Sequence, residues 1–177
     1  MTSFSPINQG QTALDTLMDN AKNPRPSEKA TAAFSTALNP PILLAETTII
    51  ELDDGGPGHA ALHIDNDGTG QAFLYDPAGS YMPKSGTRSG DLMSGEDANL
   101  QDYTNYWQRN GDTAHLHKLE TNPTQEQAII ERAEQIGNAS PPLCATSVSG
   151  ALGGVCGVES SIWPSTLGEN VDNAHCK

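Results

Sequence analysis

Short stretches of alternating apolar and polar residues occupy the middle of the chain. This period-two alternation, rich in β-branched residues, predicts strands at Thr47–Leu52, His59–Ile64 and Gln71–Asp76. Clusters of glycine, proline and aspartate at 53–58 and 65–70 separate the three stretches and are typical of turns. The last two stretches therefore predict an antiparallel hairpin.

Helical spacing begins further along the chain. Leu100–Gln108 carries leucine, tyrosine and tryptophan three or four residues apart, which predicts a helix, and Ala114–Leu119 alternates like a strand. Asn122 is followed by a proline and, three residues on, by Gln125, the pattern of a helix start. Gly137 predicts the end of that helix.

A short helix is predicted directly after the dipeptide Pro141–Pro142. Proline disfavours helix in the residue before it, so the helix begins beyond the pair. Ala145, Val148 and Leu152 then share one apolar face. Cys144 consequently lies in the first turn.

The ends of the chain and one internal stretch carry weaker patterns. Residues 1–41 predict an N-terminal helical extension, separate from a domain at residues 42–177. Pro83–Asn99 is rich in Gly, Ser and Asp and long for a connection, so it is either a lid or binding loop or a disordered surface segment. A Gly- and Ser-rich tail around Ile162–Pro164 closes the chain.

Composition narrows the range of partners. The 177 residues carry a formal net charge of −13. Nucleic acid and anionic membrane surfaces both require basic protein surface, so we expect neither, whereas a basic protein partner fits. No apolar run approaches the roughly 18 residues of a membrane span, and residues 1–10 lack the basic-then-apolar order of a secretory signal. Three cysteines allow at most one internal disulfide and leave one thiol over.

Cys144 is the candidate nucleophile. The unpaired N–H groups at a helix N-terminus favour an anion, so they lower the pKa of a thiol placed there. The same groups could bind an oxyanion during acyl transfer. The alternative is an inert buried cysteine, since free cysteines are among the most buried residues.

His59 and Asp76 are the candidate base and orienting acid. If the hairpin closes symmetrically, Ile64 faces Gln71 and His59 lies directly opposite Asp76, close enough for a hydrogen bond. A slip by one residue would move Asp76 to the other face. The alternatives are a surface strand histidine and a carboxylate that caps the turn before Pro77.

The remaining histidines fit the site less well. His63 shares the face of His59 but lies about 13 Å along the strand. In a helix the two would be spaced to bind one metal, but the flanking glycines and prolines favour a strand, so we expect neither a metal nor a cofactor. His115 and His117 read as ordinary residues of a solvated strand face, and His175 lies in the tail.

Three motifs follow one another in the order of histidine, acid and cysteine: Gly58–Ala60, Leu74–Tyr81 and Cys144–Ser149. In sequence and in this order they resemble the circularly permuted papain-like families, which include permuted NlpC-type cell-wall peptidases and relatives of lecithin:retinol acyltransferase. The resemblance is closest to toxin domains of bacterial type VI secretion effectors and polymorphic toxins, which also have a stretch similar to Ile162–Ser165. It covers about Thr47 to Val171.

The resemblance implies an α+β fold in which a small antiparallel sheet packs against the cysteine helix. It implies Cys144 as nucleophile, His59 as base and Asp76 as the acid that orients the base. The expected function is that of an antibacterial toxin that cleaves amide bonds in peptidoglycan peptides. Alternatives that use the same triad are an acyltransferase, a thioesterase or a protein deamidase. A further alternative, without catalysis, is an acidic binding module.

A toxin of this kind implies two further features. Its producer needs protection, so a cognate immunity protein is an expected partner, and the charge of −13 suggests a basic patch on it. The absent signal sequence is compatible with synthesis in the producer cytoplasm and injection into the periplasm of a target cell. It equally suits a cytosolic protein.

Overall fold

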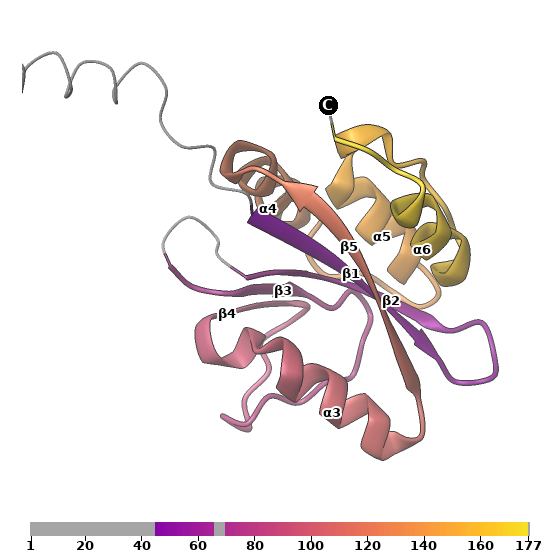
Figure 1. The fold of residues 1–177 in the computed structure, drawn as a ribbon. Coiled ribbons are helices and arrows are strands. Elements are labelled where there is room, and N and C mark those ends of the chain that lie inside the picture. The colour runs from indigo at the N-terminus through magenta and orange to yellow at the C-terminus, as the bar shows by residue number, and fades with distance from the viewer. Residues whose placement is uncertain (1–44, 66–69, 177) are drawn as a thin grey trace, which may run out of the picture. The chain divides into compact units, whose positions relative to one another are not determined.

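The computed structural model describes residues 45–65 and 70–176, and these residues form an α+β fold (Figure 1). Five antiparallel strands make one sheet in the order β4-β3-β2-β1-β5. The strands are β1 (Ala45–Asp53), β2 (His59–Ile64), β3 (Phe73–Tyr75), β4 (Leu92–Ser94) and β5 (Thr113–Thr121). The helices are α3 (Leu100–Asn110), α4 (Pro123–Ile136), α5 (Cys144–Leu152) and α6 (Pro164–Asp172), with short 3₁₀ turns at Gly95–Ala98 and Val155–Gly157.

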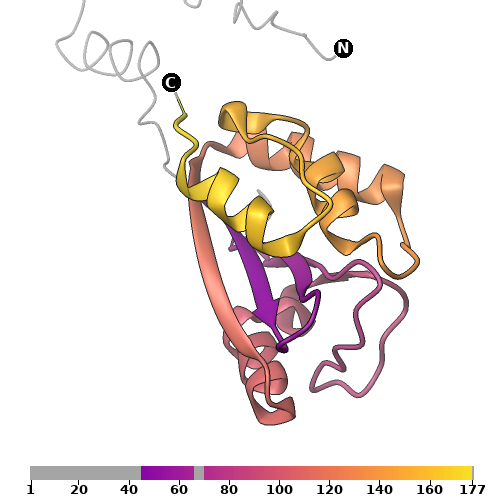
Figure 2. The same ribbon diagram turned by 90° about the vertical axis from the view of Figure 1, so that its right-hand side faces the viewer.

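Both faces of the sheet are covered by helices (Figures 1 and 2). Strand residues alternate between the faces, so Ile49 and Leu62 pack in the cluster that holds Val148 of α5, Ile129 of α4 and Leu167 of α6. The intervening strand residues pack in a second cluster with Tyr103 of α3. The cysteine helix thus lies directly on the sheet face opposite α3.

The predicted ends of α4 and α5 are confirmed. The Asn122 side chain accepts from the Gln125 N–H and the Gln125 side chain accepts from the Asn122 N–H, a reciprocal cap. Gly137 follows α4 with a φ of 66°, a left-handed conformation that favours glycine. Cys144 is the first residue of α5, and Pro141 and Pro142 precede it.

One expectation about secondary structure is wrong, and two stretches contain elements that were not predicted. Ile64 pairs with Phe73 rather than Gln71, so the hairpin register is shifted by two residues. The stretch Pro83–Asn99 contains β4 and a 3₁₀ turn. The C-terminal tail contains α6, which Pro164 opens. The predicted helical extension at 1–41 lies outside the described residues.

Candidate active site

His59 and Asp76 form a close pair at the ends of neighbouring strands. His59 begins β2, Asp76 directly follows β3, and His59 Nε2 lies 2.7 Å from Asp76 Oδ1. The expected contact is therefore present even though the expected register is wrong. A shift by two residues keeps every side chain on its face, so Asp76 reaches His59 diagonally.

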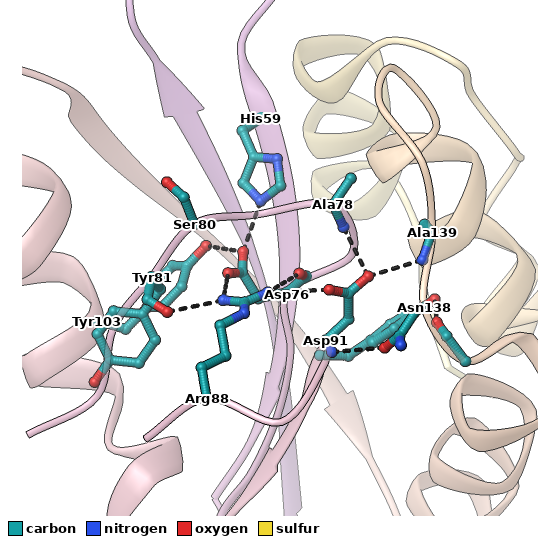
Figure 3. Close-up of polar contacts among 12 residues, drawn as sticks. His59, Asp76, Ala78, Ser80, Tyr81, Arg88, Asp91, Tyr103, Asn138 and Ala139 are labelled. Atoms are coloured by element: carbon teal, nitrogen blue, oxygen red, sulfur yellow. Dashed lines mark hydrogen bonds and ion pairs between the residues drawn. The ribbon is translucent and has the colours of Figure 1, made fainter. Parts of the chain in front are cut away.

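The Asp76 carboxylate is fully buried and held by three side chains (Figure 3). Besides His59, Tyr103 OH donates to Oδ1 at 2.7 Å and Arg88 Nη1 donates to Oδ2 at 2.6 Å. Burial alone would raise the pKa of Asp76, but these partners lower it below its ordinary value, so the group stays ionised. A Cβ at Gly79 would overlap both carboxylate oxygens, so the turn needs glycine there.

Asp91 connects this pair to the segment that precedes the cysteine helix (Figure 3). Its Oδ1 accepts from Arg88 Nη2 at 3.0 Å, and its Oδ2 accepts from the N–H groups of Ala78 and Ala139, both at 2.8 Å. Its own N–H donates to the side chain of Asn138 at 2.9 Å. One carboxylate thus joins the turn after β3, the Arg88 loop and the α4–α5 connection.

The Cys144 thiol lies beside the His59 ring, close enough for each group to shift the pKa of the other. Burial works to raise the pKa of Cys144, but the proximity and the charge of His59, together with the N–H groups of Ala60 and Ala145, lower it. Burial likewise works to lower the pKa of His59, yet Asp76 and Cys144 raise it to about 9. Both shifts favour a thiolate–imidazolium pair.

An apolar cleft of about 400 Å³ opens next to Cys144. It is bounded by Pro57, Gly58, Pro142, Leu143, Cys144, Thr146, Ile162, Trp163 and Pro164. These residues come from the turn before His59, from the segment that leads into α5 and from the segment that leads into α6. Although Cys144 is only 8% exposed, it is one of the residues that line this cleft.

The other histidines lie away from this site. His63 is buried, and burial lowers its pKa. His115 is exposed on β5, as expected. His117 is not an ordinary solvated residue, because its ring contacts both Asp172 at 2.9 Å and Glu51 at 3.1 Å.

Cysteine pairing accounts for the odd count. Cys156 and Cys176 form a disulfide, so Cys144 is the single free thiol of the three cysteines. Over residues 45–65 and 70–176, no group of three or more His, Cys, Asp or Glu side chains is arranged to hold a metal ion. None of the described helices is long and apolar enough to cross a membrane.

Arg88, Tyr103 and Asp91 were missed in the sequence. Arg88 and Asp91 lie in a stretch without apolar periodicity, where a three-residue strand leaves almost no pattern. Tyr103 reads as an ordinary apolar position of an amphipathic helix.

Comparisons with models of known protein families, with curated proteins and with solved structures found no match.

Proposed function

We propose that this protein is a cysteine hydrolase that cleaves an acyl bond with Cys144 as nucleophile, His59 as general base and acid, and Asp76 as the orienting acid. The observation that carries the proposal is the 2.7 Å contact of His59 Nε2 with a buried carboxylate, on a ring that lies beside the Cys144 thiol. A nucleophile, its base and a group that orients the base are the parts that covalent catalysis needs.

The reaction begins when the Cys144 thiolate attacks the carbonyl carbon of an amide. A carbon–sulfur bond forms, and the carbonyl oxygen becomes an oxyanion that the Cys144 N–H at the start of α5 can stabilise. The His59 imidazolium then donates its proton to the amine, the carbon–nitrogen bond breaks and a thioester remains. Neutral His59 next takes a proton from a water molecule, which attacks the thioester and releases the acid and the thiolate.

Asp76 supports both steps without exchanging a proton. It holds the His59 ring by Nε2, which leaves Nδ1 for the sulfur, and its charge stabilises the imidazolium. Arg88 and Tyr103 keep the carboxylate ionised and fix its orientation.

The permuted papain-like fold belongs to this proposal. It is supported by the chain order of His59, Asp76 and Cys144 and by a cysteine helix that packs on an antiparallel sheet. The expected substrate is an amide in a peptidoglycan stem peptide, and the expected setting is a toxin delivered to the periplasm of a target bacterium. The Cys156–Cys176 disulfide supports an oxidising destination.

Purified peptidoglycan tests the proposal directly. The wild-type protein should release muropeptides with newly freed carboxyl and amino groups, read by mass spectrometry. C144A should release none while it keeps the circular dichroism spectrum and thermal unfolding of the wild type. In cells, export of the wild-type protein to the periplasm should lyse the cell and export of C144A should not. Equal release by C144A would overturn the proposed nucleophile.

A further inference from the structure

Three apolar side chains stand exposed beside the candidate nucleophile. Leu143 is 47% exposed, Ile162 65% and Trp163 55%, and all three line the cleft that contains Cys144. Apart from Cys144 itself, none of the described side chains that line the cleft is ionisable, although the chain carries a net charge of −13. The cleft wall next to the nucleophile is therefore neutral.

The wall of this cleft is built to hold its shape. Ser149, a buried residue of α5, accepts from the Ser161 N–H at 3.0 Å and donates to the Ser161 carbonyl at 3.1 Å. The Ser161 hydroxyl in turn accepts from the Trp163 N–H at 2.9 Å and donates to the Trp163 carbonyl at 3.0 Å. Ser161 is therefore bonded to the cysteine helix, and its hydroxyl in turn holds the backbone at Trp163.

We propose that this cleft binds a neutral aliphatic group directly beside the bond that Cys144 attacks, and that Ile162 and Trp163 determine this specificity. The inference rests on the proposed function, since it takes Cys144 as the nucleophile. Exposed single apolar residues are common, but three around a fixed cleft with a nucleophile in its wall form a binding site. The volume of about 400 Å³ lies near the lower end for ligand sites, so it holds one part of a substrate.

Two kinds of substrate could supply the neutral aliphatic group that enters the cleft. In a stem peptide, alanyl methyl groups would enter the cleft and the acidic side chains would stay outside it. In an acyl ester or thioester, a linear chain would enter instead. Branched and linear alkyl groups of increasing length distinguish the two.

Alkylation of Cys144 by substituted iodoacetamides tests the proposal without a natural substrate. The thiolate displaces iodide from each reagent and forms a carbon–sulfur bond, and intact-mass spectrometry follows the rate at the single free thiol. We expect N-hexyl iodoacetamide to react about tenfold faster than N-(5-carboxypentyl) iodoacetamide, because burial of several methylenes is favourable and burial of a carboxylate is not. N-isobutyl and N-octyl reagents then show whether the cleft prefers a side chain or a long chain.

Cleft variants make the test specific. W163A should abolish the hexyl preference, and I162K should reverse it, since a positive charge in the cleft attracts the carboxylate of the other reagent. L116A is the matched control, because Leu116 is an exposed apolar residue outside the cleft. Fast reaction with every reagent, without an alkyl preference, would overturn this inference and leave the proposed function standing. Slow reaction with every reagent would overturn both.

Discussion

Replacing His59 with alanine should raise the pKa of Cys144 and so reduce its thiolate fraction. A cysteine with the ordinary pKa of 9.0 is about 1% ionised at pH 7, whereas His59 lowers the pKa of Cys144 against the effect of burial and increases that fraction. Full ionisation sets an upper limit of about 100-fold on this gain in thiolate. A thiolate of lower pKa is intrinsically less nucleophilic, so we expect a loss in alkylation rate of up to about 50-fold in H59A at pH 7.

The assay is the rate of iodoacetamide alkylation between pH 5.5 and 10. The wild-type rate should level off at a lower pH than the rate of H59A, because His59 lowers the pKa of Cys144. Below its plateau, the rate of H59A should rise about tenfold per pH unit. H115A, which removes an exposed histidine of β5, should keep the wild-type profile. Wild-type and H59A rates that level off at the same pH would refute the ion pair.

Three further predictions concern the surroundings of Asp76. R88A should lower the free energy of unfolding by about 3 kcal/mol in urea titrations, because it leaves the buried Asp76 carboxylate without one of its partners. The control K84A removes an exposed ion pair and should change the free energy of unfolding by less than about 0.5 kcal/mol. Equal effects of the two variants would contradict this prediction. G79A should lower the unfolding free energy by about 2 kcal/mol and reduce turnover, since its methyl group displaces the Asp76 carboxylate, and unchanged turnover would show that the turn adapts. Because the pKa of Asp76 is lowered on folding, its contribution to stability is complete above pH 3.8 and is lost as the pH falls through its folded-state pKa. The stability of D76N should therefore decline less steeply with falling pH below pH 4 than that of the wild type. Parallel stability curves of the two proteins would argue against the pKa shift.

Local patterns were sufficient to predict the three proposed triad positions. Cys144 followed from two prolines and a helical apolar face, which are both local signals. His59 and Asp76 were placed on one face by strand alternation, and this survived an error of two residues in register because the side-chain period of a strand is two. An error of one residue would have separated them.

The residues that hold the proposed triad in place could not be predicted from local sequence patterns. Arg88 reaches Asp76 and the backbone carbonyl of Tyr81 from a loop, and such contacts depend on how distant segments pack. The helix α6 was missed because its apolar residues, Leu167 and Val171, are separated by polar and glycine positions. Their burial against the sheet, rather than helix propensity, stabilises that helix.

The Asp91 carboxylate couples the proposed triad to the chain between α4 and α5. It belongs neither to the strand that bears the imidazole nor to the helix that bears the sulfur, yet it is bonded to segments next to both. A displacement of the chain at Ala139 would thus be transmitted through two hydrogen bonds to Arg88 and onward to the base. Substitutions in the loop between α4 and α5 would therefore lower the rate of the proposed reaction from a distance, whereas changes at the far end of β5 would leave that rate unchanged.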